Sequence, residues 1–103
     1  MSALGHGQLW WADLDEVRPV VVLTRQRVAS RLVRILVAPI TTTVRGLATE
    51  VALGTAEGVQ DGSVASLDNL QQVPVDCLLR RAGQVAPERW PEFCSAMAKV
   101  MAC

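Results

Sequence analysis

The sequence contains no apolar run long enough to cross a lipid bilayer, which takes roughly 20 consecutive apolar residues. The N-terminal stretch MSALGHGQLWW lacks the basic start and the long apolar segment of a secretory signal peptide. These absences argue against a membrane-spanning helix and predict a protein of the cytoplasm. With 103 residues the chain is too short for two hydrophobic cores, so we expect one domain over residues 1–103.

Residue types suited to metal binding or to standard catalysis are few. The three cysteines, Cys77, Cys94 and Cys103, have no metal-ligand spacing and lie far in sequence from the single histidine, His6. We therefore expect free thiols, with Cys94 in the core of a helix, and no metal ion or other cofactor. The sequence also lacks the GxSxG, HExxH, P-loop and dinucleotide motifs. Any catalysis must use other groups.

Charge is balanced overall but unevenly distributed. The formal net charge is zero, yet the segment 17–49 has no acidic residue and carries six arginines: Arg18, Arg25, Arg27, Arg31, Arg34 and Arg45. The planar guanidinium group suits phosphate oxygens. Two interpretations stay open: an anion-binding face for nucleic acid, or an ordinary solvated basic surface.

Short apolar runs bounded by turn residues predict an antiparallel β-sheet. Val20–Leu23 is a β-branched run typical of a strand buried on both faces. Of Trp10 and Trp11 in the first strand, we expect one to be buried and the other to lie at a surface or an interface. The expected strands are 7–14, 18–24, 33–40, about 48–53, two short strands within 63–73, and 80–85.

The segment 86–102, APERWPEFCSAMAKVMA, predicts an amphipathic C-terminal helix. Its large apolar side chains recur at helical spacing, at Trp90, Phe93, Cys94, Met97 and Met101. Short strands followed by one helix indicate an α+β fold. We expect a small, strongly bent antiparallel barrel with the helix packed on it.

The strongest candidate site combines Arg18, at the head of the second strand, with Thr41–Thr43, at the tail of the third. Pro19 stiffens the backbone around Arg18. If the two strands are antiparallel neighbours, Arg18 lies near Thr41, and a cation beside a hydroxyl can bind a phosphate. In the other interpretation Arg18 pairs with Glu16, and the threonines only solvate a strand end. Both interpretations stay open.

Four motifs, VRPVVVL, VAPITTT, SVASLDNLQQV and LLRRAGQVAPERW, resemble in order and spacing those of the MazF/PemK toxins of type II toxin–antitoxin systems. The resemblance covers nearly the whole chain, and VAPITTTVRGLATEV looks especially like the actinobacterial members. It implies an SH3-like barrel of the MazF, Kid and CcdB type that forms a homodimer and cleaves single-stranded RNA without a metal. It also implies a MazE-type antitoxin as partner, with a disordered tail that wraps the dimer.

The resemblance also assigns roles to residues. The arginine of the family's RP motif and the threonine of its PIT motif are the catalytic pair, and they match Arg18 and Thr41. A glutamine that contacts substrate in some members is matched by Asn69, a shorter amide. The other expected substrate-binding residues are Glu16, Arg25, Thr42, Thr43 and Arg45. The loop DLDEVRP is shorter than the glycine-rich loop of the family, so we expect a more open RNA groove and put the sequence preference in doubt.

The implied reaction is attack of a ribose 2′-OH on its own 3′-phosphate, which leaves a 2′,3′-cyclic phosphate and a 5′-OH. Because a guanidinium group stays protonated at neutral pH, we expect Arg18 to stabilise transition-state charge while Thr41 donates a hydrogen bond. Two other functions stay open. One is a protein-binding poison on the same barrel, like the gyrase-directed CcdB type, and the other is an inactive partner that only binds antitoxin.

Overall fold

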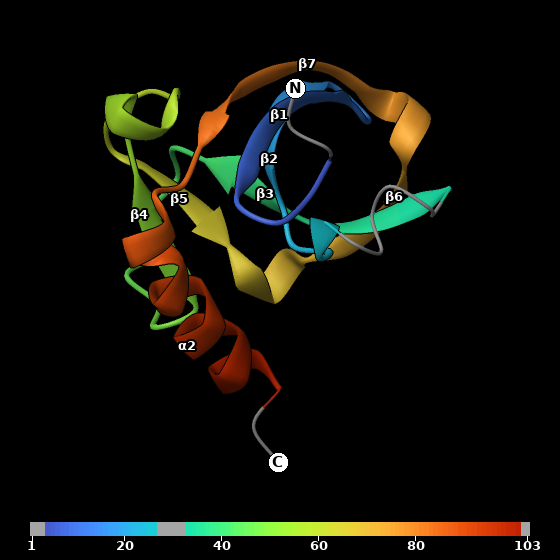
Figure 1. Ribbon diagram of the computed structural model, residues 1–103. Helices are drawn as coiled ribbons and strands as arrows, with labels where there is room; N and C mark the ends of the chain where they lie inside the picture. The colour runs from blue at the N-terminus through green and yellow to red at the C-terminus, as the bar shows by residue number, and fades with distance from the viewer. Residues whose placement is uncertain (1–3, 27–32, 102–103) are drawn as a thin grey trace.

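The computed structural model describes residues 4–26 and 33–101, which form a bent antiparallel sheet and a C-terminal helix (Figure 1). The arginines Arg27 and Arg31 and the cysteine Cys103 lie outside the described residues. The strands are β1 Gln8–Asp13, β2 Val17–Val22, β3 Arg34–Thr41, β4 Glu50–Leu53, β5 Ser63–Ser66, β6 Gln71–Pro74 and β7 Leu78–Gln84. Short 3-10 helices join them: η1 Thr55–Glu57, η2 Leu67–Asn69, η3 Val75–Cys77 and η4 Pro87–Arg89.

The strand β3 is the branch point of the sheet. The strand order is β4-β5-β3-β2-β1-β7, and β6 also pairs with β3. Along one edge of β3, the first half pairs with β6 and the last two residues pair with β5. The chain then passes from β6 through η3 directly into β7, which brings the strands β7, β1, β2, β3 and β6 into a ring (Figure 1). The expected antiparallel barrel is confirmed.

The strand β2 is buried on both faces, as its apolar run predicts. Val20 and Val22 pack in a cluster inside the ring with Ile35, and Val21 packs in a second cluster on the other face. Val20, Val21 and Val22 are fully buried, whereas Val17 at the start of the strand is 55% exposed. The strand therefore forms a rigid wall, and its first residues extend beyond that wall as a firmly anchored end.

Two glycines let the η1 turn approach β7 closely. A Cβ atom added to Gly83 would lie 1.9 Å from the carbonyl oxygen of Glu57, and one added to Gly58 would lie 2.2 Å from that of Ala82. Gly58 also has a φ of +94°. Only residues without a side chain fit here. Gly83 belongs to the motif LLRRAGQVAPERW, so close packing explains the glycine of this motif.

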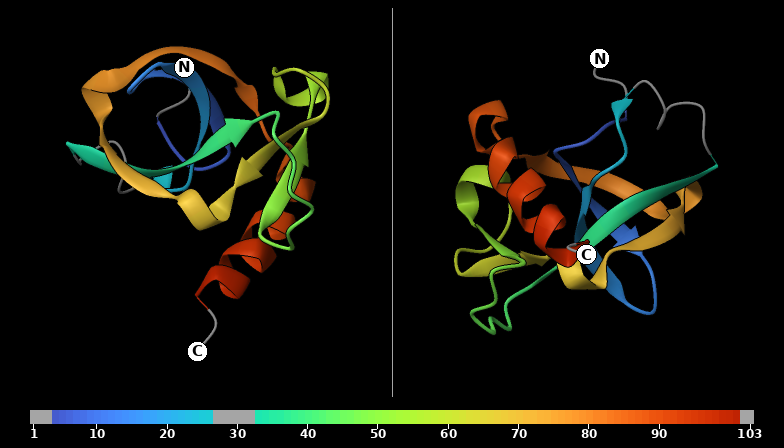
Figure 2. Two further views of the ribbon diagram at one scale, coloured as in Figure 1. Left: turned by 180° about the vertical axis from the view of Figure 1, so that it is seen from behind. Right: turned by 90° about the horizontal axis from the view of Figure 1, so that it is seen from below.

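The helix α2, Trp90–Val100, covers the second core cluster from outside the ring, beside β4 and β5 (Figures 1 and 2). Its buried residues are Phe93 and Ala96. The sequence-based prediction that Cys94 belongs to the core is wrong, because Cys94 is exposed. Met101, which also stood in the expected apolar stripe, is 72% exposed. The small side chain of Ala96 faces the sheet instead.

Arg89 connects the start of α2 to the sheet. Its guanidinium binds both carboxylate oxygens of Glu92 at 2.9 Å, donates to the carbonyl of Ala52 at 2.8 Å and lies 3.2 Å from the buried carboxylate of Glu57. Glu57 in turn accepts the N–H of Gly54 at 2.8 Å. The hydrogen bonds between Arg89 and Glu92 raise the pKa of Arg89 and lower that of Glu92.

The helix α2 spans 11 residues. Across residues 4–26 and 33–101, no helix is both long and apolar enough to cross a membrane.

Candidate functional site

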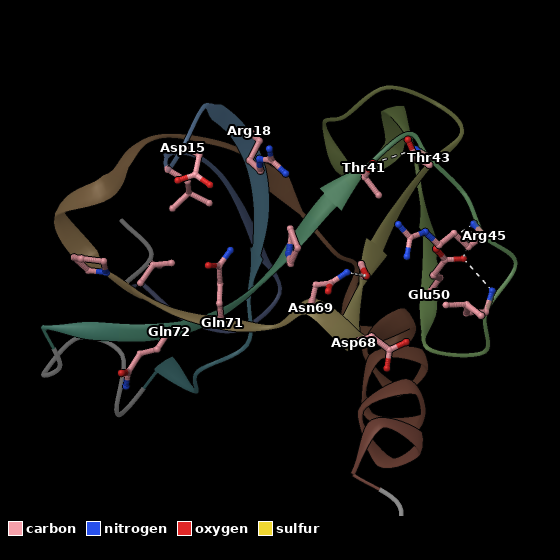
Figure 3. Close-up of a pocket in the computed structure, with 16 residues that line it drawn as sticks. Asp15, Arg18, Thr41, Thr43, Arg45, Glu50, Asp68, Asn69, Gln71 and Gln72 are labelled. Carbon is pink, nitrogen blue, oxygen red and sulfur yellow. Dashed lines mark hydrogen bonds between the residues drawn. The ribbon is translucent and has the colours of Figure 1, made fainter.

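A groove with a volume of about 780 Å³ runs across the barrel beside the end of β3. Its walls come from the β1–β2 turn, the ends of β2 and β3, the loop after β3 and the segment from β5 to β6. Most of the residues that line it carry hydroxyl, amide or charged groups: Asp15, Arg18, Thr41, Thr43, Arg45, Glu50, Ser66, Asp68, Asn69, Gln71 and Gln72 (Figure 3).

Strand register brings Arg18 and Thr41 together. The strands β2 and β3 are antiparallel, with Val20 opposite Pro39. Arg18 precedes Val20 by two residues and Thr41 follows Pro39 by two, so both lie at the same end of the strand pair. Both side chains line the groove. In Figure 3 the Arg18 side chain extends from β2 toward the end of β3 that carries Thr41. The neighbour relationship predicted from the sequence is confirmed.

The ion pair that the sequence left as an alternative is also present. One Nη atom of Arg18 lies 2.6 Å from a carboxylate oxygen of Glu16. The Arg18 side chain is 38% exposed and has five N–H donors in all, so a phosphate can bind it beside the carboxylate. The ion pair of the second interpretation is present, and phosphate binding by Arg18 stays a prediction.

The hydroxyl of Thr41 is oriented by the chain that follows it. Its oxygen accepts the backbone N–H of Thr43 at 3.1 Å, which leaves the hydroxyl hydrogen able to donate elsewhere. The side chains then alternate. Thr43 lines the groove together with Thr41, whereas Thr42 lines a smaller hollow on the other side.

A carboxylate holds the loop that carries Arg45. Glu50 accepts the backbone N–H of Arg45 at 3.2 Å and that of Leu47 at 3.0 Å. This bonding fixes the loop at the rim, and Figure 3 shows the Arg45 side chain on the same side of the groove as Glu50. Arg45 thus lies at the groove, and its contact with substrate stays a prediction.

Asn69 reaches the groove from η2. Its side-chain N–H donates to the hydroxyl of Ser66 at 2.9 Å, which leaves the amide oxygen as an acceptor. Sequence reasoning did not name Gln71, which follows on β6 and points into the ring toward Asp15 (Figure 3). The available signal was the polar pair Gln71–Gln72, which stands inside a motif already identified.

The described arginines of the cationic segment 17–49 do not lie on one face. Arg18 and Arg45 line the groove, but Arg25 follows the far end of β2 and Arg34 begins β3, at the opposite end from Thr41. Arg25 is therefore not brought to the groove. The groove also contains Asp15, Glu50 and Asp68. Among residues 4–26 and 33–101, the arginines that line the groove are Arg18 and Arg45.

A second hollow of about 280 Å³ adjoins the same pair of residues. Arg18 and Thr41 line it as well as the groove, so they separate two depressions. Its other residues are Trp11, Glu16, Pro19, Ile40, Thr42, Val59, Gln60 and Ser63. Trp11 is half-buried here, while Trp10 packs against the core cluster inside the ring and donates its ring N–H to Gln8 at 3.0 Å.

No metal-ligand set forms among the residues that the structure describes: no three His, Cys, Asp or Glu side chains gather in one place there. Cys77 and Cys94 are free thiols. Burial, and after it the charge of Asp13, raises the pKa of the Cys77 thiol.

The motifs on this barrel match a known family over residues 6–101, described as the PemK-like, MazF-like toxin of type II toxin–antitoxin systems. The chain belongs to that family. This MazF-like toxin is similar to the probable endoribonuclease MazF5 of Mycobacterium tuberculosis, with 41% identity over 107 residues, covering 100% of this chain and 98% of the relative.

Solved structures share the fold. The Mycobacterium tuberculosis toxin MazF-mt6 superposes with a TM-score of 0.88 at 42% identity, covering 91% of this MazF-like chain and 95% of that one. A mycobacterial endoribonuclease in complex with its cognate antitoxin superposes with a TM-score of 0.86 at 24% identity, covering 96% and 95%. The second likeness shows the fold alone. The resemblance found in the sequence is confirmed.

Proposed function

We propose that this MazF-like toxin is an endoribonuclease that cleaves single-stranded RNA, and that the scissile phosphate binds between the side chains of Arg18 and Thr41. The observation that carries the proposal is the pairing of β2 with β3, which puts a guanidinium and an oriented hydroxyl on the ridge between two depressions. The names of the similar mycobacterial proteins support the same activity.

The proposed reaction needs no cofactor. The ribose 2′ oxygen forms a bond to the adjacent phosphorus and loses its proton, and the bond from phosphorus to the 5′ oxygen breaks as that oxygen takes up a proton. The products are a 2′,3′-cyclic phosphate and a 5′-OH. Arg18 stabilises the charge that develops on the phosphoryl oxygens, and Thr41 donates its hydroxyl hydrogen to one of them. Glu16, at 2.6 Å from Arg18, orients the guanidinium.

The remaining groove residues are proposed substrate contacts. Arg45 and Thr43 suit phosphate oxygens, and the amide of Asn69 suits a base edge, because amides pair with donors and acceptors together. Thr42 and Glu16 face the smaller hollow. Arg25 stays a prediction for RNA that extends beyond the groove. Such contacts would make cleavage sequence-selective, although they do not define the sequence.

We further propose that the protein acts in the cytoplasm as a homodimer of one-domain chains, and that a MazE-type antitoxin restrains it through a disordered tail. Membership of a type II toxin–antitoxin family supports the antitoxin, because the family is defined by such a pair. A mycobacterial relative of the same fold is described as bound to its cognate antitoxin.

Expression in a growing culture tests the activity. We expect growth arrest with RNA fragments whose 5′ ends carry hydroxyl groups and map to one recurrent sequence. Damaged DNA with intact RNA would instead indicate a gyrase-directed poison, and arrest without damage to either would contradict both.

The purified protein tests the chemistry. Cleavage of a short RNA with the mapped sequence should survive EDTA. Replacing only the ribose 5′ of the scissile bond by its 2′-deoxy form should abolish cleavage while binding persists, because phosphate contacts and stacking supply most of the affinity for a single strand. A product that ends in a plain 3′-OH would contradict the mechanism.

A further inference from the structure

The small hollow beside Arg18 has the chemical character of a site for one aromatic ring. Apolar surface comes from Trp11, Pro19, Ile40 and Val59. Polar groups come from Thr42, Gln60 and Ser63. Its volume of about 280 Å³ is little more than a third of that of the groove, which suits a single nucleotide unit and not a longer segment.

The ring of Trp11 is held in place by its neighbours on both adjoining strands. On β7 the guanidinium carbon of Arg80 lies 5.4 Å from the ring centroid, in a cation–π contact. Strand pairing sets Trp11 opposite Arg80 on one side and Pro19 on the other. An aromatic platform that is already ordered loses little conformational entropy when a ligand stacks on it.

The position of the hollow relative to the reacting phosphate is the decisive relationship. A phosphate bound by Arg18 and Thr41 carries one nucleotide on each side, and a depression lies on each side of that pair. The groove, with Asn69 and Gln71, accommodates the RNA on one side of the scissile phosphate. The hollow with Trp11 accommodates the nucleotide on the other side.

We propose that Trp11 is the stacking platform for the base of the nucleotide that adjoins the scissile phosphate on the side away from the groove. The proposal rests on the endoribonuclease function proposed above. Base–aromatic stacking contributes a factor of about 5 to 150 in affinity and accepts any base. The hollow therefore supplies binding at that position, while base discrimination falls to the amides of the groove.

Cleavage of matched substrates by matched variants tests the proposal. The substrate is a short RNA with the mapped cleavage site, compared with versions in which the base on one side of the scissile bond, then on the other, is replaced by an abasic ribose. The variants are Trp11→Leu, Trp11→Phe and, as control, Trp10→Leu, which makes the same change at a tryptophan facing the barrel interior. The readout is kcat/KM for intact substrate divided by kcat/KM for abasic substrate.

For the wild-type protein and for Trp10→Leu we expect this ratio to be about tenfold or more at one of the two positions. Trp11→Leu should bring the ratio at that position close to one, and Trp11→Phe should restore most of it, because phenylalanine keeps an aromatic face. The ratio at the other position should not change.

Two results would overturn the proposal while leaving the nuclease intact. One is equal loss of activity by Trp11→Leu on intact and abasic substrates. The other is a Trp11→Leu protein whose oligomeric state differs in sedimentation and whose ratio is unchanged, which would place Trp11 in a subunit interface. Absence of RNA cleavage by the wild-type protein would instead contradict the proposed function itself.

Discussion

The carboxylate of Glu16, in the turn before β2, lies 2.6 Å from the guanidinium of Arg18, two residues further along the chain. Both groups are well exposed, at 74% and 38% of the side chain, so solvent screens the pair and its contribution to stability is small. Its consequence is orientation, because the bond directs the guanidinium that the proposed reaction uses.

We expect Glu16→Gln to reduce the single-turnover cleavage rate by about tenfold, because an amide orients Arg18 less firmly than a carboxylate does. RNA affinity should stay unchanged or increase, since a negative charge near the phosphate is removed. Quench-flow rates and fluorescence anisotropy measure the two quantities. Weaker RNA binding at an unchanged rate would show that Glu16 contacts the substrate directly.

Removing either member of the central pair should remove activity without unfolding the protein. Arg18→Ala and Thr41→Val should each reduce the cleavage rate by a factor of hundreds, about 3 to 4 kcal/mol of transition-state stabilisation. Thr41→Ser should retain most activity because it keeps the hydroxyl. Arg25→Ala is the matched control, since it removes an arginine at the other end of β2, and it should cleave a short RNA within about threefold of the wild-type rate.

The cluster around Arg89 should govern stability. Arg89→Ala leaves the buried carboxylate of Glu57 without its cation, so we expect unfolding in urea to require about 3 kcal/mol less free energy at pH 7. Glu88→Gln, a change on the neighbouring exposed side chain, should have almost no effect. An Arg89→Ala protein as stable as wild type would mean that the cluster contributes nothing to stability.

The same cluster predicts a pH dependence. The hydrogen bond from Arg89 lowers the pKa of Glu92 below its ordinary value of 4.5. The ionised carboxylate therefore favours the folded state; this contribution is complete above pH 4.5 and is lost as the pH falls through the lowered value. The difference in urea midpoint between wild type and Glu92→Gln should shrink when the pH is reduced from 6 to about 3.

Gly83 should be intolerant of a side chain for a steric reason. Its added Cβ would meet the carbonyl of Glu57 at 1.9 Å, so Gly83→Ala should cost about 2 to 3 kcal/mol or displace the η1 turn. Gly62→Ala has open space around it and a φ of +85°, and it should cost about 1 kcal/mol from backbone strain alone. Thermal denaturation distinguishes the two, and equal losses would argue against the steric explanation.

Local patterns in the sequence determined the strands, the neighbours of β2 and the catalytic candidates. The Val-rich run of β2 predicts burial on both faces, because no polar residue interrupts it. The short link 14–17 between the first two expected strands predicts a hairpin, because it allows only antiparallel pairing, and β1 and β2 do pair in this way. Arg18 and Thr41 follow from the same logic, because neighbouring antiparallel strands bring the start of one beside the end of the other.

Only the tertiary structure decided which face each element presents to its neighbours. Helical spacing allows several adjacent apolar stripes on α2. The burial of Phe93 follows from the predicted stripe, whereas the burial of Ala96 in place of Cys94 depends on how the helix lies against the sheet. The charge pattern likewise grouped Arg25 with Arg18, although strand direction separates them to opposite ends of β2. The hollow at Trp11 required residues of β1, β2, β3 and β5 to come together, and such long-range pairing leaves no periodic signal in the chain.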